Sequence, residues 1–356
     1  MKKTKHTSNS LLFNELVDNG FDFLMQAVSE FDKKPKYSVV HFSTAVELIL
    51  KARLVHDHWS LIVEGSPNIG KFKDGSFKSI NFNELIPRIE GVTGERISPE
   101  IKACFDAIAK HRNKMVHFFH EADVKKNNKK IIKEIAIEQS AGWFYLRRLI
   151  EKWSPIFVEY DDKVSSLNMQ MKNHRVFLST VFEKIKPEID LDKNRGSTYK
   201  TCFSCGFEAS YKKPLTANLF ECTCKVCLLK ENTIEIKCPN CAKDIELDQE
   251  AAPDFECPEC NERIAEHNLN HQLNTEPVTY DDYLDNVNIN CAMCVSMDTV
   301  IKHETYFICK FCLAIENDMR VCDWCNEGQI GGGDLEFSYI SGCEFCDGQA
   351  PHLKDD

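Results

Sequence analysis

The chain has 356 residues, of which 43% are hydrophobic, and a formal net charge of -11. This length suffices for two or three domains, and the hydrophobic content is ordinary for a soluble globular protein. The polar first ten residues contain no apolar stretch fit for a signal peptide, and no apolar run approaches the length of a membrane span. These features exclude a membrane-spanning class and favour a cytoplasmic protein.

Charge and cysteine are distributed unevenly along the chain. Residues 1–195 carry 32 Lys and Arg against 26 Asp and Glu, a net charge of +6, whereas residues 196–356 carry 12 against 29, a net charge of -17. Of the 18 cysteines, only Cys104 lies in the first part. The sequence therefore predicts two regions with different chemistry.

The first region is predicted to be an all-helical bundle over residues 10–190. Apolar residues recur at three- and four-residue spacing in residues 10–30 and again in residues 37–58, with Pro35 between the two stretches. Residues 65–79 are rich in Gly, Ser and Lys and are predicted to form a loop.

A longer helix is predicted to begin with Ser98 as its N-cap and Pro99 at its first position, and to end near His120. The other predicted helices of this region span residues 82–89, 133–153 and 161–186. A succession of such helices is typical of a bundle.

The long predicted helix carries the run R-N-K-M-V-H at residues 112–117. Asn113 and His117 are four residues apart and share a helix face, whereas Arg112 lies about 140° around the helix from His117. Cleavage of RNA by its own 2'-OH needs a proton acceptor or donor with a pKa near neutrality, which suits His117, and a positive charge on the phosphorane oxygens, which suits Arg112. Asn113 could orient the phosphate or the imidazole, and Glu47 is a candidate supporting acid.

This run resembles the R-x4-H motif of HEPN domains, a family of helical bundles that includes many metal-independent ribonucleases. Residues 45–54 also resemble the second helix of that family, and the resemblance covers about residues 10–155. It implies an endoribonuclease that needs no metal for catalysis. It also implies that two copies of the motif meet across a homodimer to form one composite site, and that the RNA product ends in a 2',3'-cyclic phosphate.

Other interpretations of the same residues remain open. The motif could only cap the helix, pair with Glu47 or Asp106, or stabilise a dimer, and some HEPN domains lack nuclease activity. Glu47 could equally form nothing more than a salt bridge. His111 and His120 flank the motif without matching it, and we interpret them as surface or dimer residues.

Eight Cys-x-x-Cys pairs follow in the second region. In chain order they make four units, with 18, 15, 14 and 17 residues between the two pairs of each unit. Two residues between cysteines let a tight turn aim both sulfurs at one ion, and a hairpin of about 15 to 20 residues returns the second pair to complete a tetrahedron. In a reducing compartment this spacing predicts metal binding and not disulfides. The predicted zinc ligands are Cys202, Cys205, Cys224, Cys227, Cys238, Cys241, Cys257, Cys260, Cys291, Cys294, Cys309, Cys312, Cys322, Cys325, Cys343 and Cys346.

The pairs resemble the knuckles of zinc ribbons, most of all C-P-N-C at residues 238–241 and C-P-E-C at residues 257–260. Because protein ligands fill all four positions of each ion, the four zincs are predicted to be structural, and zinc binding would supply much of the folding energy of each ribbon. The whole chain is thus predicted to be an α+β multidomain protein. The predicted parts of this second region are ribbons 1 and 2 in residues 197–270, a linker in residues 271–288, and ribbons 3 and 4 in residues 289–350.

Several residues that could compete as ligands or react have plainer interpretations. Cys222 lies two residues before Cys224 and is interpreted as a spare thiol, because a two-residue gap favours Cys224 as the ligand. His267 and His271 are one helical turn apart and could bind a metal, or could belong to a polar connecting helix. Cys104 is interpreted as a small buried apolar side chain.

The charge of the cysteine-rich region bears on its partners. Each zinc with four thiolates has a net charge of -2, so four such units add about -8 to the formal charge of this region. Such an acidic surface should repel a phosphate backbone, with Lys212 and Lys213 as a local exception. We therefore expect this region to bind a protein partner or to fold back on the basic helical region.

Three functional hypotheses follow. The first is a HEPN-type endoribonuclease acting on RNA, as in toxin or antiphage (antiviral) defence proteins that the family resembles, with the acidic zinc array recognising a partner or restraining the nuclease. The second is a dimeric adaptor without catalysis, in which the zinc array docks proteins. The third, a nucleic-acid-binding regulator, is disfavoured by the negative charge.

Overall fold

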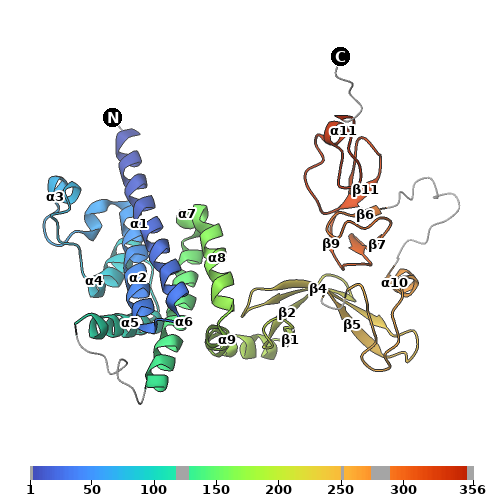
Figure 1. The fold of residues 1–356 in the computed structure, drawn as a ribbon, viewed down its shortest axis with the longest axis horizontal. Helices are drawn as coiled ribbons and strands as arrows, with labels where there is room; N and C mark the ends of the chain where they lie inside the picture. The colour runs from blue at the N-terminus through green and yellow to red at the C-terminus, as the bar shows by residue number, and fades with distance from the viewer. Residues whose placement is uncertain (1–2, 118–127, 250–251, 274–288, 351–356) are drawn as a thin grey trace. The chain divides into compact units, whose positions relative to one another are not determined.

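The computed structural model describes residues 3–117, 128–249, 252–273 and 289–350 (Figure 1). The chain divides into two compact units, Met1–Pro187 and Glu188–Asp356. The first unit is helical, and the second holds β-sheets and four clusters of cysteines, so the chain has an α+β fold. Within the described ranges, none of the helices is both long enough and apolar enough to span a bilayer.

Most of the helices lie where the spacing of apolar residues predicts them. The predicted single helix over residues 161–186 is wrong, because the chain turns at Asn173 and the ring of His174 packs on Phe31, with centroids 4.8 Å apart. Asn is a poor residue for a helix interior, so a turn is favoured there. The helical elements are α1 (Lys3–Glu30), α2 (Pro35–Asp57), the 3-10 helix η1 (Trp59–Ile62), α3 (Ile69–Lys73), α4 (Phe82–Thr93), α5 (Pro99–His117), α6 (Asn128–Lys152), α7 (Ser154–Phe157), the 3-10 helix η3 (Val158–Tyr160), α8 (Asp161–Lys172) and α9 (Arg175–Asn194).

Helices α2, α5 and α6 pack closely at a glycine. A Cβ atom at Gly142 of α6 would lie 2.4 Å from Cδ1 of Ile108 on α5 and 2.8 Å from Cε1 of Phe42 on α2, so a larger residue would force the helices apart. A buried polar contact lies between the same helices, since the side-chain amide of Gln139 donates to Oγ of Ser38 at 2.7 Å. These contacts fix the positions of α2 and α5, the two helices that carry the predicted catalytic residues.

A backbone hydrogen bond joins the two ends of the segment between α2 and α4. The backbone N–H of Ile80 donates to the carbonyl of Ile62 at 2.9 Å, and Ile80 itself is buried. Asn81 then starts α4 through a capping box with Glu84, in which each side chain accepts from the other residue's backbone N–H. Residues 79–83 consequently have a fixed place beside α2 and α5.

The second unit contains three sheets. The largest is antiparallel, with strand order β1-β2-β3-β4-β5. Its strand β4 lies between the first and second cysteine units and pairs with β3 on one side and β5 on the other, so it joins these two cysteine units. The other sheets have orders β7-β8-β9 and β10-β11-β6, and in the last of these β6 pairs in parallel with β11, joining units 3 and 4. The elements are β1 (Thr198–Thr201), β2 (Glu208–Pro214), β3 (Leu219–Cys224), β4 (Lys230–Lys237), β5 (Asp244–Asp248), α10 (Glu266–Leu273), β6 (Ile289–Cys291), β7 (Val300–His303), β8 (Tyr306–Cys309), β9 (Ile315–Glu316), β10 (Arg320–Val321), β11 (Gly328–Ile330) and α11 (Ser338–Ser341).

One face of the five-stranded sheet forms a hydrophobic core with the third cysteine unit. Ile234 of β4 and Leu247 of β5 belong to the same buried cluster as Ile308 of β8 and Leu273 of α10. The first three cysteine units therefore share one core. Residues 271–273 of the predicted linker belong to α10, and residues 274–288 lie outside the described part.

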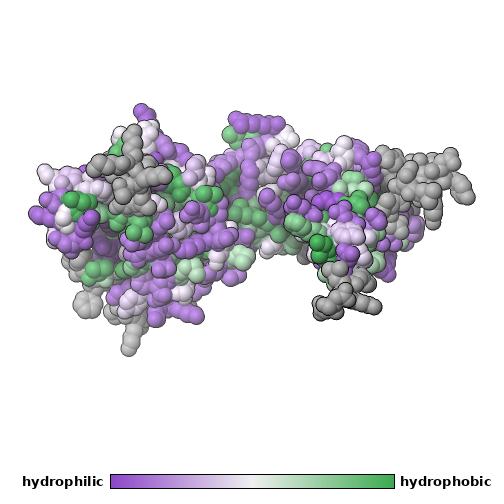
Figure 2. Space-filling model, turned by 90° about the horizontal axis from the view of Figure 1, so that it is seen from above, coloured by the Kyte–Doolittle hydropathy of each residue, from purple (hydrophilic) through white to green (hydrophobic). Residues whose placement is uncertain are grey.

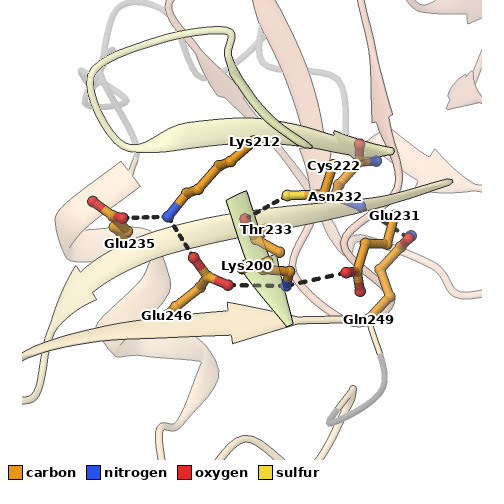
Figure 3. A network of polar contacts seen from close by, with 9 residues as sticks. All are labelled: Lys200, Lys212, Cys222, Glu231, Asn232, Thr233, Glu235, Glu246 and Gln249. Carbon is orange, nitrogen blue, oxygen red and sulfur yellow. Dashed lines mark hydrogen bonds and ion pairs between the residues drawn. The ribbon is translucent and has the colours of Figure 1, made fainter. Parts of the chain in front are cut away.

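The opposite face of the sheet carries a network of ion pairs, drawn in Figure 3. Nζ of Lys200 lies 2.9 Å from a carboxylate oxygen of Glu246 and 3.1 Å from one of Glu231. Lys212 forms ion pairs with both Glu235 and Glu246. Glu231 is only 3% exposed, and its burial raises the pKa of its carboxyl group, so the positive charge of Lys200 compensates a costly buried anion.

These ion pairs show that the sheet is strongly curled. Lys200 is on β1 and Glu246 is on β5, at opposite edges of the five strands. In a flat sheet these edges would be roughly 19 Å apart, much further than a lysine side chain reaches. The first and last strands are therefore brought together by side chains and not by backbone pairing.

Replacing Lys200 should destabilise the second unit more than removing an exposed lysine does. In Lys200→Met the carboxylate of Glu231 would stay buried without its cation, at a cost of about 3 kcal/mol. The control Lys237→Met removes a partner of Asp244 from a pair whose side chains are 70% and 78% exposed, and should change little. Urea unfolding of the metal-loaded proteins measures both effects, and equal losses in the two variants would contradict the role given to Lys200.

Candidate metal centres and a polar cavity

Sixteen of the cysteines gather into four groups of four. In each group the Sγ atoms all lie within 4.8 Å of one another. The groups are the same fours that the chain order and spacing predict. They are Cys202, Cys205, Cys224 and Cys227; Cys238, Cys241, Cys257 and Cys260; Cys291, Cys294, Cys309 and Cys312; and Cys322, Cys325, Cys343 and Cys346.

The distances between sulfurs fit a tetrahedral metal ion. Across the groups they include 3.5 Å for Cys202 and Cys227, 3.6 Å for Cys238 and Cys260, and 3.9 Å for Cys325 and Cys343. Four thiolates about 2.3 Å from a central ion would be about 3.8 Å apart, whereas a disulfide needs about 2.05 Å. Each group can therefore hold one four-coordinate ion, and all these cysteines are free thiols.

Six of the eight Cys-x-x-Cys pairs share one backbone turn. The N–H of the first cysteine donates to the carbonyl five residues later, and the N–H four residues later donates back to the carbonyl of the first cysteine. For Cys257 these bonds are 2.8 Å to Glu262 and 2.8 Å from Asn261. The turn points both side chains of a pair to the same side, as a shared ion requires. The six pairs begin at Cys202, Cys224, Cys238, Cys257, Cys309 and Cys322.

The residue after the second cysteine has a left-handed backbone in seven of the eight pairs. Only one of these residues is a glycine, and Val295, with φ of 53°, has a branched Cβ that makes this conformation costly. Such strain persists only where surrounding interactions determine the backbone, and a bound ion would be such an interaction. The seven residues are Gly206, Leu228, Ala242, Asn261, Val295, Leu313 and Asn326.

Each group contains one thiol whose pKa is lowered, and these are Cys227, Cys238, Cys309 and Cys322. A hydrogen bond from the backbone N–H of Cys241 lowers the pKa of Cys238 to about 7. The neighbouring thiol of Cys224 lowers the pKa of Cys227 to about 5. Thiolates are the form that binds metal, so one cysteine of each group is favoured as a ligand, whereas the pKa values of its neighbours Cys224 and Cys241 are raised.

The residues with plainer interpretations stay apart from the four groups. Cys222 is buried on β3 with its Sγ 3.6 Å from Oγ1 of Thr233, and burial raises the pKa of its thiol. His267 and His271 are exposed on α10. Lys212 does not form the basic patch that the sequence suggested, because its two glutamate partners neutralise it.

In the helical unit, three of the four predicted catalytic residues line one cavity. Glu47 comes from α2, and Arg112 and Asn113 come from α5. The cavity has a volume of about 360 Å³. Its other lining residues are Ser43, Ser79, Ile80, Asn81, Phe82, Asn83 and Ala109, and we refer to it as the polar cavity.

Three hydrogen bonds arrange the charges at the polar cavity. Nη1 of Arg112 donates to Oδ1 of Asn113 at 2.9 Å. Nζ of Lys51 donates to Glu47 at 2.5 Å and to Oγ of Ser79 at 3.0 Å. Glu47 thus forms its salt bridge with Lys51 and not with Arg112, and among the described residues Arg112 has no carboxylate partner. The positive charge of Arg112 is therefore available to an anionic ligand.

Helix α5 is anchored on the side away from the polar cavity. Nε2 of His111 lies 2.6 Å from a carboxylate oxygen of Glu138 on α6, so His111 joins two helices within the bundle. Sγ of Cys104 lies 3.7 Å from the carbonyl of Glu138, and burial raises the pKa of its thiol to about 12. The backbone of His117 ends α5, but its side chain lies outside the described part, as does the whole of His120.

Some residues of the polar cavity were not predicted from the sequence. Lys51 does not line the cavity but pairs with Glu47, and it had a local signal because it lies one helical turn after Glu47 on the same face. Ser79, Phe82 and Asn83 had none, because residues 65–79 show no periodicity and nothing in the sequence places their end beside α5.

Comparisons with models of protein families, with curated proteins and with solved structures gave no match to this chain. The four cysteine groups and the polar cavity are therefore the features that indicate a function.

Metal content tests the assignment of ligands. We expect four zinc ions per chain, three in Cys257→Ser because its group loses one ligand, and four in the control Cys222→Ser. Mass spectrometry of the metals in purified protein gives these numbers. Since Cys257 also belongs to the buried core around β4 and β5, circular dichroism should show loss of structure only in Cys257→Ser. A lost ion in Cys222→Ser would contradict the assignment.

Proposed function

We propose that the helical unit is a metal-independent endoribonuclease of the HEPN type and that the second unit is an array of four structural zinc sites that recognises a partner or restrains the nuclease. The observation that carries the nuclease proposal is that Glu47, Arg112 and Asn113, from two helices, line the same polar cavity. Among the described residues Arg112 has only the neutral Asn113 as a side-chain partner, which suits a site for a phosphate.

Zinc is the proposed ion because the donors are all thiolates at tetrahedral distances. Iron prefers a similar set of ligands and is the alternative, and its visible absorption would identify it. Filled by four protein ligands, each ion would leave no position for water, so the proposed role is to hold the fold. Free thiolates of this kind are kept reduced in a cytoplasmic compartment.

The proposed reaction is an attack of the RNA 2'-oxygen on the adjacent phosphorus. One imidazole accepts the proton of the 2'-hydroxyl, the bond from phosphorus to the 5'-oxygen breaks, and a second imidazole gives a proton to the leaving 5'-oxygen. The products are a 2',3'-cyclic phosphate and a 5'-hydroxyl. In a homodimer each subunit would supply one His117, while Arg112 neutralises the charge that builds up on the non-bridging oxygens.

Asn113 and Glu47 have supporting roles in this proposal. By accepting from Arg112, Asn113 holds the guanidinium over the polar cavity. Glu47 keeps Lys51 beside Ser79, so a second positive charge stays next to the cavity. Both residues position charged groups, whereas Arg112 and His117 would contact the reacting phosphate.

The surface of the second unit favours a protein partner for the zinc array. Its residues 289–350 carry ten Asp and Glu against three Lys and Arg. Within this acidic stretch Met293, Val295 and Met297 are 65%, 63% and 60% exposed. Figure 2 shows a face on which hydrophilic residues predominate and hydrophobic ones form small patches. Exposed methionines adapt to varied apolar partners, and this observation also favours the second candidate function, a dimeric adaptor without catalysis.

The nuclease proposal predicts that Arg112→Ala and His117→Ala each lose at least about 100-fold of the cleavage rate on a mixed RNA pool. Wild-type cleavage should survive brief treatment with EDTA and leave 2',3'-cyclic phosphate ends, since no metal takes part in the reaction. The control is Lys110→Ala, which removes a positive charge from the same helix at an exposed position. Cleavage that persists in Arg112→Ala at matched zinc content would refute the proposal and favour the adaptor.

Removal of residues 196–356 tests restraint by the zinc array. If the array restrains the nuclease, the truncated protein should cleave RNA faster and be more toxic to growing cells than the whole chain. The double variant Arg112→Ala/His117→Ala in the truncated chain is the control, because any toxicity that depends on cleavage must disappear there. Unchanged cleavage and toxicity would leave partner recognition as the role of the array.

A further inference from the structure

The polar cavity has a second wall that the cleavage chemistry does not use. Arg112 and Asn113 form the wall from α5, while Ser79, Asn81, Phe82 and Asn83 form another from the chain around the start of α4. The capping box and the backbone bond of Ile80 fix this second wall. A volume of 360 Å³ lies at the lower end of the range for small-molecule sites and leaves room for a nucleotide beside the phosphate that Arg112 would hold.

Most polar groups in the cavity already have partners within the protein. Oδ1 of Asn81 accepts the backbone N–H of Glu84, Oδ1 of Asn113 accepts from Arg112, and Glu47 accepts from Lys51. Asn83 differs, because it is exposed on the first turn of α4 and its side-chain amide has no partner among the described residues. Its donor and its acceptor are both available to a ligand.

A carboxamide of this kind matches one base in particular. The amide of Asn can donate to N7 of adenine and accept from its N6 amino group, and on this Hoogsteen edge no other base offers a donor beside an acceptor. Phe82, next to Asn83 and half-buried, gives an apolar surface against which a base can pack. The cations that could read guanine are committed elsewhere, Lys51 to Glu47 and Ser79, and Arg112 to the phosphate.

We propose that Asn83 and Phe82 form a base subsite that selects adenine next to the scissile phosphate. This inference rests on the proposed ribonuclease function, and it adds the base preference of the same site. Asn83 determines specificity and takes no part in proton transfer. Its replacement should therefore remove discrimination between bases while cleavage itself continues.

The test uses the full-length, zinc-loaded protein and four RNA oligonucleotides of uridine that differ by one central A, C, G or U. For the wild type we expect kcat/KM on the adenine oligonucleotide to exceed the others by about 10-fold or more. In Asn83→Ala this preference should fall to about twofold or less, with the other three rates unchanged. Asn19→Ala, an exposed asparagine on α1, is the matched control and should retain the preference.

Different outcomes separate this inference from the nuclease proposal. Equal wild-type cleavage of all four oligonucleotides, or an adenine preference that Asn83→Ala retains, overturns the base subsite and leaves the nuclease standing. A preference for cytosine would assign base reading to Glu47, whose carboxylate can accept from the cytosine amino group. Absence of all cleavage rejects the nuclease proposal.

A binding measurement decides the base subsite without cleavage. Fluorescence anisotropy can compare the same oligonucleotides carrying 2'-deoxy sugars, which cannot form the cyclic phosphate. Tighter binding of the adenine oligonucleotide, lost in Asn83→Ala, supports the subsite even if the RNA is not cut. Equal binding of all four overturns it.

Discussion

The fold of the second unit depends on one requirement, that four sulfurs meet within a few ångströms of a common centre. The paired cysteines satisfy it by forming nearly the same turn again and again, although this places residues such as Leu228, Val295 and Leu313 in a left-handed backbone that costs each of them energy. Ion binding is thus the interaction that would offset the strain, and the short strands extend outward from turns that it fixes.

The metal centres nevertheless determine only local geometry, and the sheet determines how the modules assemble. Its apolar face packs on β8 and α10, and side-chain amides of Asn232 and Gln249 donate to the backbone carbonyls of Leu313 and Cys312 beside the third metal centre. Its other face is closed by ion pairs between the first and last strands. Loss of one of the first three ions should consequently disturb the core that these three cysteine units share.

The parts that could be predicted from the sequence are those set by local spacing. The four groups of four cysteines and most helices follow from short-range sequence patterns. The ion pair of Lys51 with Glu47 could also have been predicted, because the two residues are one helical turn apart. The turn at Asn173 depends on a contact of His174 with Phe31, far away in the chain. Likewise, the approach of Lys200 to Glu246 depends on the curl of five strands, and no pattern in either segment encodes it.

Lysine and arginine side chains have different partners in the two units, and this difference bears on the proposed binding of RNA. In the second unit Lys200 and Lys212 each form ion pairs with two carboxylates, so these two positive charges are neutralised and offer little to a phosphate. In the helical unit Arg112 has a neutral partner, and Lys51 stands behind Glu47 at the edge of the same cavity. If the helical unit binds RNA as proposed, the guanidinium of Arg112 would attract a phosphate at one point, and selectivity would depend on short-range contacts in the polar cavity. The polar groups that line this cavity would supply such contacts, because hydrogen bonds to a base discriminate between bases and long-range charge does not.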